Sequence, residues 1–401
     1  MSGPELITLG CRLNIAESEA IRAMLRGQDD LIVVNSCAVT AEAVATARKA
    51  VRRARRERPD ARIVVTGCAA DIEPAAFAGF AEIVPNTAKL DPARYSDVDG
   101  APATLWAPAF AGGERRHARA FLPVQNGCDH RCTFCIIPFG RGPSRSLPAG
   151  GVIDEVRSAV RNGAKEIVLT GVDLTAYGAD LPGAPSLGLL VERILRHVPE
   201  LGRLRLSSLD PCEVDDRLID LIAHEPRLMP HLHLSLQAGD DLILKRMKRR
   251  HSRRQAVDLV ARLRALRPGL AIGADLIAGF PTEDEVAFAN TLRLVDECGI
   301  VFAHIFPYSP RPGTPAARMP QLERSVIKQR AARLRDEAAR VRSAWLLEQV
   351  GTVQDVLVEL DGTSGHAANF ARVTLPASPP NSLVTIRIAA VDGDALVGIA
   401  A

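Results

Sequence analysis

The feature that most constrains this chain is a set of three cysteines, each of which directly follows a strand-like apolar run. The runs cover residues 5–10, 31–36 and 62–67 and lead into Cys11, Cys37 and Cys68. Helix-prone segments separate the runs, and this alternation is typical of a parallel sheet. Since the carboxyl ends of neighbouring parallel strands meet at one edge, the three thiols are predicted to converge there.

A second set of three cysteines is local: Cys128, Cys132 and Cys135 form a C-x3-C-x2-C run. Three thiolates can hold a 4Fe-4S cluster and leave one iron without a protein ligand. The amine and carboxylate of S-adenosylmethionine can chelate such an iron, and an electron from the cluster can then break the C–S bond. Two sets therefore predict two clusters. The alternative for the local set is zinc, which would need a fourth ligand such as His130.

Length and composition place the chain among globular proteins. It has 401 residues, 47 % of them apolar and 24 % charged, which predicts two or three domains around ample cores. Residues 1–5 show no basic region before an apolar stretch, and no run of about 18 apolar residues occurs, so no secretory leader and no membrane span are expected. We expect a cytoplasmic protein with reduced thiols. Cys212 and Cys298, outside both sets, are predicted to be buried or half-buried structural thiols.

Basic residues are clustered although the net charge is only +3. The clusters fall within residues 48–58, 115–119 and 245–254. Each one alone is equally consistent with a solvated helix face. Three of them in a near-neutral chain favour a nucleic-acid footprint.

The predicted fold class is α/β, in three folded parts and a linker. Residues 1–90 form a small parallel-sheet domain, residues 91–119 an Ala-, Pro- and Gly-rich linker, residues 120–349 an open partial (β/α)6 barrel, and residues 350–401 a small all-β domain. The predicted barrel strands are 121–125, 166–170, 203–207, 231–236, 271–278 and 301–306. The predicted helices are 151–162, 187–199, 213–225, 240–266, 283–298 and 321–349. Three terminal strands are predicted at 353–360, 371–375 and 383–388.

The flanks of the six cysteines carry a family resemblance. Residues 125–146, QNGCDHRCTFCIIPFGRGPSRS, are similar to the signature of the radical S-adenosylmethionine enzymes and, more narrowly, of the methylthiotransferases. Residues 8–14, 34–40 and 65–69, TLGCRLN, VNSCAVT and VTGCA, resemble the same family. Residues 304–317, HIFPYSPRPGTPAA, most resemble the branch that acts on threonylcarbamoyladenosine at position 37 of tRNA. The resemblance covers essentially the whole chain.

The resemblance implies an N-terminal cluster domain, a radical S-adenosylmethionine barrel and a C-terminal RNA-binding domain of the TRAM type. It implies replacement of the C2 hydrogen of the adenosine by a methylthio group. In the family, the cluster on the Cys128 set generates a 5′-deoxyadenosyl radical, and the cluster on the Cys11, Cys37 and Cys68 set delivers the sulfur. The implied partners are tRNA and an electron donor such as flavodoxin or ferredoxin, and the sulfur donor is not specified.

Further candidates for cofactor contact are Phe134, Thr170, Gly171, Ser207, Gln237 and Gly279. Thr170 and Gly171 end a predicted strand where the family contacts the amino-acid part of S-adenosylmethionine. Ser207 and Gln237 lie at or near strand ends, where packing or capping is the competing interpretation. Thr282, three residues after Gly279, stands where the family usually has glycine.

Three other functions stay open at this stage. The same chemistry acts on isopentenyladenosine-37 of tRNA in one branch of the family and on a ribosomal-protein aspartate in another. A non-enzymatic alternative is an RNA-binding protein with structural metal.

Overall fold

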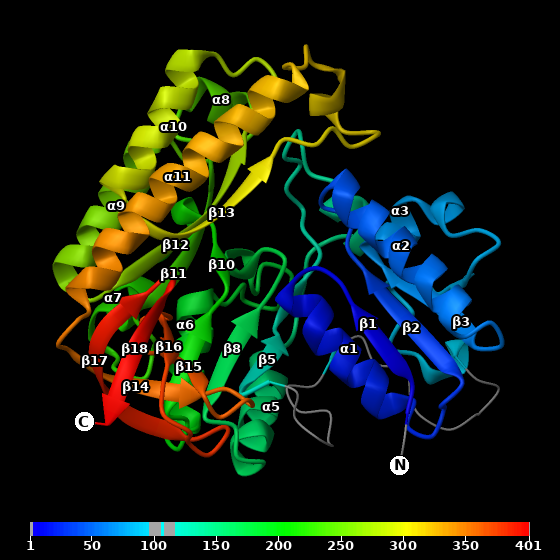
Figure 1. The fold of residues 1–401 in the computed structure, drawn as a ribbon, viewed down its shortest axis with the longest axis horizontal. Helices are drawn as coiled ribbons and strands as arrows, with labels where there is room; N and C mark the ends of the chain where they lie inside the picture. The colour runs from blue at the N-terminus through cyan, green and yellow to red at the C-terminus, as the bar shows by residue number, and fades with distance from the viewer. Residues whose placement is uncertain (1–2, 96–105, 108–116, 401) are drawn as a thin grey trace.

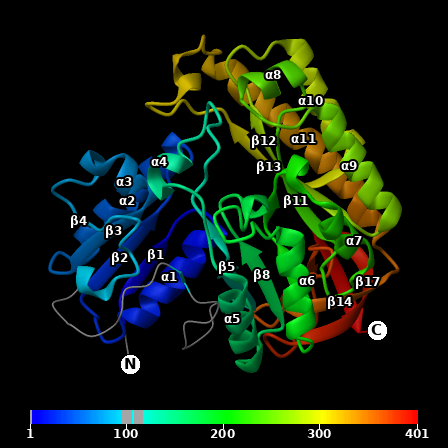
Figure 2. The same ribbon diagram turned by 180° about the vertical axis from the view of Figure 1, so that it is seen from behind.

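The computed structural model describes residues 3–95, 106–107 and 117–400. These residues form an N-terminal parallel sheet, a central curved parallel sheet covered by helices, and a small closed barrel of C-terminal strands. Figures 1 and 2 show the N-terminal sheet (blue) beside the central barrel (green to orange), with the C-terminal barrel (red) at one end of the central strands. The predicted α/β class and three-part architecture are confirmed.

The N-terminal sheet has the strand order β1-β2-β3-β4, and every neighbouring pair is parallel. Its strands are β1 Glu5–Thr8, β2 Leu31–Ser36, β3 Arg62–Gly67 and β4 Glu82–Ile83. Its helices are α1 Arg12–Met24, α2 Ala41–Glu57 and α3 Cys68–Ile72. All residues of β2 are buried, because separate apolar clusters cover the two faces of the sheet.

The central sheet is built from parallel strands in two hydrogen-bonded groups, β5-β8-β9 and β10-β11-β12-β13. Its strands are β5 Arg119–Pro123, β8 Glu166–Thr170, β9 Arg203–Leu206, β10 Ser208–Leu209, β11 His231–Gln237, β12 Ala271–Ala278 and β13 Ile300–Pro307. The covering helices are α5 Ala149–Arg161, α6 Leu187–His197, α7 Asp216–His224, α8 Asp241–Arg246, α9 Arg253–Leu266, α10 Glu285–Glu297 and α11 Arg324–Glu348. Because β9 and β10 are one strand interrupted at Ser207, the six predicted barrel strands are all present.

Alternation along the strands gives the barrel a polar interior. Leu232, Leu234 and Leu236 of β11 belong to the core that also contains the helix residues Val260 and Leu263. The intervening side chains of a strand point to the opposite face. The interior therefore receives the buried polar groups Glu166, Arg205, His231 and His233 and the half-buried Asp275.

Short elements complete the fold. A two-stranded antiparallel ladder joins β6 Gln125–Asn126 to β7 Arg145–Ser146, and α4 spans Ile137–Arg141 between them. Short 3-10 turns occupy Pro74–Ala76, Pro92–Arg94, Leu174–Ala176, Pro211–Glu213 and Pro315–Arg318. The C-terminal barrel contains β14 Val353–Val358, β15 Ser364–Ala367, β16 Arg372–Thr374, β17 Leu383–Asp392 and β18 Ala395–Ala400. The sequence had indicated three of these five strands.

The C-terminal barrel covers the amino ends of the central strands. Arg119, the first residue of β5, forms an ion pair with Glu359 at 3.0 Å. Arg203, the first residue of β9, donates to the carbonyl oxygen of Asp355 at 2.6 Å. Since chemistry in such barrels occurs at the carboxyl ends of the strands, this part closes the opposite end.

Two local expectations were wrong. The single helix predicted at 240–266 is two helices, α8 and α9, because Lys248 takes a left-handed backbone conformation with φ +57° between them. Cys212 is exposed, whereas Cys298 is buried as expected. Within the residues that the structure describes, no helix combines the length and the apolar character that a membrane span requires.

Candidate active site

The N-terminal cysteines lie together at one edge of their sheet. Cys11 and Cys37 follow β1 and β2, and Cys68 begins α3 directly after β3. A Cβ atom at Gly10, whose φ is +108°, would lie 2.7 Å from the Cβ of Cys37, so only glycine allows the first two cysteines to approach so closely. Cys11 is exposed, Cys37 is half-buried and Cys68 is buried, so the set borders a solvent-accessible space.

The second set lies on a loop that leads from β6 to α4. Gly127, with φ +74°, precedes Cys128, and a Cβ there would lie 1.9 Å from the carbonyl oxygen of Pro143. The backbone N–H of Thr133 donates to the carbonyl of Met247 at 3.1 Å, so the turn between α8 and α9 holds the middle of the loop. The guanidinium of Arg249, from the same turn, donates to the Sγ of Cys132 at 3.7 Å.

The structure brings the two sets next to each other. Helix α4, which begins two residues after Cys135, packs on α3, which begins at Cys68. A Cβ at Gly140 would lie 3.2 Å from the Cβ of Cys68. Asn86 spans the junction, because its Nδ2 donates to the carbonyl of Gly140 at 2.6 Å and lies 3.7 Å from the Sγ of Cys68.

The surroundings of the six cysteines suit ligands of a metal cluster better than they suit free thiols. All eight cysteines are unpaired, so neither set forms a disulfide. Burial raises the pKa of Cys37 to about 11 and that of Cys128 to about 12, and burial also raises the pKa of Cys135 to about 12. A thiolate in such surroundings would need a cation beside it, and a bound metal cluster would supply one. The N–H donors on Cys68 and Cys132 are of the kind that tune iron–sulfur ligands.

A buried charge network joins the two parts of the site. Arg141, at the end of α4, donates to Glu17 of α1 at 2.9 Å, to Asn14 at 2.5 Å and to Asn126 at 3.0 Å. Lys89 also forms an ion pair with Glu17. Burial opposes the ionisation of Glu17, but Arg141 and Lys89 outweigh it and lower its pKa to about 2. The network therefore fixes the Cys128 loop against the N-terminal sheet.

Replacing Glu17 by glutamine should lower the free energy of unfolding by about 3–5 kcal/mol, because two buried cations lose their shared anion. Denaturant unfolding at neutral pH measures the change. Glu19→Gln, on the same helix, removes a partly exposed pair with Arg22 at 2.6 Å and should cost less than about 1 kcal/mol. Equal effects of the two changes would contradict a special role for the network.

The predicted contacts on the first barrel strands lie where β8 and β9 end. Thr170 and Ser207 are buried, and their hydroxyl oxygens have no hydrogen-bond partner among the described residues. A Cβ at Gly171 would lie 2.9 Å from the Oε1 of Gln125. That oxygen accepts from the backbone N–H groups of Val172 and Asp173, both at 2.9 Å, so Gly171 allows the strand-end loop to pack on β6.

The remaining predicted contacts lie on the other side of the barrel. Gln237 ends β11 with φ +69°, and Gly279 follows β12 with φ +76°. Phe134 packs edge-on against Phe280 with ring centroids 6.5 Å apart, beside the Gly279 loop. Thr282, the position where the family usually has glycine, keeps a left-handed conformation with φ +68°.

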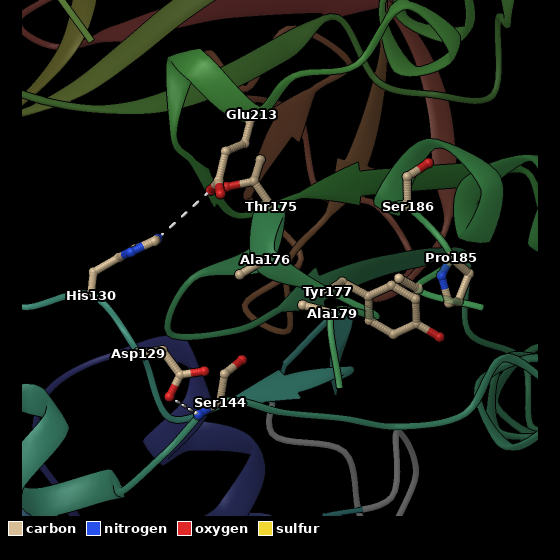
Figure 3. A pocket seen from close by; sticks show the side chains of 11 residues that line it. Asp129, His130, Ser144, Thr175, Ala176, Tyr177, Ala179, Pro185, Ser186 and Glu213 are labelled. Carbon is tan, nitrogen blue, oxygen red and sulfur yellow. Dashed lines mark hydrogen bonds and ion pairs between the residues drawn. The ribbon is translucent and has the colours of Figure 1, made fainter. Parts of the chain in front are cut away.

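A cavity of about 310 Å³ lies beside the Cys128 loop (Figure 3). His130 and Glu213 border it, and the Nε2 of His130 lies 2.8 Å from an oxygen of Asp173 and 3.9 Å from one of Glu213. These two carboxylates raise the pKa of His130 to about 10, so the imidazole is protonated. The sequence offered His130 only as a zinc ligand, because its partners are 43 and 83 residues away in the numbering.

Sequence reasoning also assigned no role to Asn14, Asn86 and Arg141. Asn14 lies 3.8 Å from the Sγ of Cys11 and Asn86 lies 3.7 Å from the Sγ of Cys68, whereas Arg141 acts through Asn14 and Glu17. The predicted basic clusters separate in the structure. Arg246 and Arg249 turn inward and donate to Thr282 and Asp210. Arg115 and Arg116 lie outside the described residues. Helix α2 presents an exposed basic face with Arg48, Lys49, Arg52, Arg53 and Arg56. In the third cluster, Lys245, Lys248, Arg250 and Arg254 are also exposed.

Two family models match the chain. The model described as the radical SAM superfamily covers residues 122–295, and the one described as uncharacterized protein family UPF0004 covers residues 5–85. The first therefore contains the Cys128 set and the second contains the Cys11, Cys37 and Cys68 set.

Two curated relatives match nearly the whole chain. The threonylcarbamoyladenosine tRNA methylthiotransferase MtaB of Rickettsia prowazekii is 45 % identical over 92 % of this chain and 91 % of its own. The tRNA-2-methylthio-N(6)-dimethylallyladenosine synthase of Erythrobacter litoralis is 35 % identical over 88 % and 86 %.

A solved structure shares the fold. It is the radical S-adenosylmethionine methyltransferase TsrM of Kitasatospora setae with cobalamin and a [4Fe-4S] cluster bound, 17 % identical with a TM-score of 0.53 over 79 % of this chain and 77 % of that one. The identity and coverage of the curated relatives establish the family of this chain. The chain belongs to the radical S-adenosylmethionine methylthiotransferase family.

Proposed function

We propose that this protein transfers a methylthio group to C2 of N6-threonylcarbamoyladenosine at position 37 of tRNA. The observation that carries the proposal is that the two cysteine sets lie next to each other, joined through Asn86 and the Arg141 network. The sequence likeness to an enzyme with this name supports the choice of nucleoside. The cofactors are two 4Fe-4S clusters and S-adenosylmethionine.

The residues fit a division of roles between the two sets. Cys128, Cys132 and Cys135 would hold the cluster that binds S-adenosylmethionine, and Cys11, Cys37 and Cys68 would hold the second cluster. When bound, these groups supply one-electron cleavage of the sulfonium and an exchangeable sulfur.

The protein itself positions the reactants. Arg249 keeps an N–H donor on Cys132. The loop after Thr170 and the residues Ser207, Gln237 and Gly279 form the strand-end rim on which the cofactor would rest. Phe134 packs edge-on against Phe280 beside Gly279 of this rim. We infer that the segments 1–90, 91–119, 120–349 and 350–401 are its domains and linker, with RNA binding by the last.

The deciding experiment uses the full chain reconstituted anaerobically with iron and sulfide. We expect about eight irons per chain. Incubation with S-adenosylmethionine, dithionite and tRNA carrying threonylcarbamoyladenosine should give the methylthio nucleoside, detected by mass spectrometry. Parallel incubations use tRNA carrying isopentenyladenosine and the ribosomal-protein substrate of the family. Product only on one of these would assign that branch instead, and stoichiometric zinc without product would favour the RNA-binding protein.

We propose flavodoxin or ferredoxin as the electron donor and the cytoplasm as the place of action. Either protein could supply the electron for reductive cleavage of S-adenosylmethionine. The sulfur source is left to experiment.

Helix α2 is the surface on which we expect RNA phosphates. Arg55 donates to the carbonyls of Pro59, Ala61 and Phe80, and Arg53 pairs with Glu57 at 2.8 Å. The cations left for a partner are therefore Arg48, Lys49, Arg52 and Arg56.

Changing these four residues to glutamine should weaken tRNA binding and flatten the slope of log affinity against log salt by about 2 to 3, because each phosphate contact releases counterions. Filter binding between low and moderate salt measures both quantities. Cleavage of S-adenosylmethionine without tRNA serves as the control and should not change. An unaltered slope would mean that α2 is only a solvated face.

A further inference from the structure

Three guanidinium groups converge on one aromatic ring inside the molecule. The Cζ atoms of Arg12, Arg119 and Arg205 lie 5.6, 5.1 and 4.9 Å from the ring centroid of Phe370. Arg12 begins α1, Arg119 begins β5 and Arg205 lies on β9, whereas Phe370 comes from the C-terminal barrel. The folded chain therefore brings three positive charges from separate elements onto a ring that a fourth segment supplies.

Two of the three guanidiniums have carboxylate partners. Arg205 donates to both oxygens of Glu166, at 2.7 and 3.2 Å, and Arg119 pairs with Glu359 at 3.0 Å. Glu166 also lies 3.7 Å from Arg203, so one carboxylate serves two guanidiniums. The group as a whole therefore carries an excess of positive charge.

Arg12 has no such partner. Among the described residues its guanidinium makes no hydrogen bond or ion pair, and its contact is with the face of Phe370. The carboxylates whose charges attract it are those of Glu166 and Asp275. Both are engaged elsewhere, since Asp275 holds His233 at 2.9 Å and His304 at 3.1 Å. A half-buried guanidinium without an anion is costly, and a cation–π contact offsets only part of that cost.

The position of Arg12 suggests which anion it serves. Its backbone directly follows Cys11 of the set that would deliver sulfur to C2 of the adenine, and its side chain extends from there to Phe370. In the purine ring, C2 and the carbon that bears N6 flank the same nitrogen, N1. The proposed function requires C2 of the bound adenine to lie at this cysteine set, so a substituent on N6 would lie on the same side of the base. The threonylcarbamoyl group ends in a carboxylate, whereas a dimethylallyl group is an uncharged hydrocarbon.

We propose that Arg12 is the specificity-determining residue of this enzyme and binds the carboxylate of the N6 substituent of the substrate adenosine. The inference rests on the proposed function. The interaction is a charge-assisted hydrogen bond between a planar guanidinium and a carboxylate, and the desolvated site strengthens it. A neutral substituent would leave Arg12 without a partner, so the same residue selects against it.

The test compares three anticodon stem-loops on the reconstituted full-length enzyme, using fluorescence anisotropy. Position 37 carries threonylcarbamoyladenosine, the same nucleoside with its carboxylate converted to a methylamide, or unmodified adenosine. The wild type should bind the first at least about tenfold more tightly than the second, the factor that corresponds to 1.4 kcal/mol. Arg12→Gln should bind the two equally, and Arg12→Lys should recover part of the preference.

The control is Arg22→Gln, on the same helix and paired with Glu19, which should keep the wild-type preference. The melting temperature of the Arg12→Gln variant should equal or exceed that of the wild type, because an unpaired charge is removed. A lower melting temperature with an unchanged preference would make Arg12 a packing residue and overturn the inference. Equal weakening of all three stem-loops would assign Arg12 to a backbone phosphate and would also overturn it.

Failure of the proposed function gives a different result. If the enzyme methylthiolates only isopentenyladenosine and the wild type shows no preference for the carboxylate, the nucleoside assignment has failed. If threonylcarbamoyladenosine is the substrate and Arg12→Gln keeps the full preference, the assignment stands and only the role of Arg12 is wrong.

Discussion

Replacing Cys132 by alanine is expected to abolish reductive cleavage of S-adenosylmethionine. Two thiolates cannot hold a 4Fe-4S cluster with its open iron in the required place. The change also leaves Arg249 without the sulfur atom to which it donates at 3.7 Å. Formation of 5′-deoxyadenosine under dithionite, measured by chromatography, should fall to the level of a reaction without enzyme.

A matched control is Cys298→Ala. This thiol is buried between the end of α10 and the start of β13, at the amino end of the barrel and away from both cysteine sets. We expect a small loss of stability from the lost sulfur volume and wild-type cleavage. Wild-type production of 5′-deoxyadenosine by Cys132→Ala would remove the Cys128 loop from the chemistry.

Replacing Cys37 by alanine should separate the two halves of the reaction. The N-terminal set loses one ligand, whereas Cys128, Cys132 and Cys135 lie on a different part of the chain and keep their cluster. We predict that cleavage of S-adenosylmethionine continues, that no methylthio group reaches tRNA, and that iron content falls by about half. The measurement pairs 5′-deoxyadenosine by chromatography with methylthiolated nucleoside by mass spectrometry on the same samples.

The opposite outcome for Cys37→Ala is equally informative. Full methylthiolation would mean that the N-terminal cysteines only stabilise the fold and that sulfur reaches the base by another route. Loss of both reactions would instead mean that the junction of α3 and α4 transmits the damage to the second set. Asn86→Ala, which removes the side chain that bridges Gly140 and Cys68, would then reproduce the effect.

Much of the fold was predictable, because buried parallel strands appear in the sequence as continuous apolar runs. Buried runs such as Leu31–Ser36 and Glu166–Thr170 are continuous and apolar enough to define parallel strands. The break between α8 and α9 was not predictable, because Lys248 is an ordinary helix-forming residue and its left-handed conformation depends on tertiary packing. The short strands β15 and β18 were missed because they contain glycine and pair only within a closed barrel.

In the candidate site, too, some residues were predictable from the sequence and others were not. The cysteines were visible because their spacing and their positions after strands are encoded locally. The charge network of Glu17, Lys89 and Arg141 was invisible, because it joins residues up to 124 positions apart. The basic cluster near Arg249 had suggested a nucleic-acid contact, but Arg249 itself points into the protein. Sequence shows a charge, but only the fold shows whether its partner is solvent, a carboxylate such as Asp210, or a thiol.

The C-terminal barrel supplies contacts that the central barrel needs, so truncation or exchange of this part affects both. Phe370, Glu359 and the carbonyls of Asp355 and Ala368 are supplied by that barrel to arginines at the amino ends of the central strands. The C-terminal barrel thus closes one end of the central barrel and is also the candidate RNA-binding domain. A chain that ends before Val353 would expose the amino ends of the central strands to water. Several buried arginines would lose their partners at the same time. Exchange of this module between relatives should therefore succeed only when the arginines beneath it are exchanged with it.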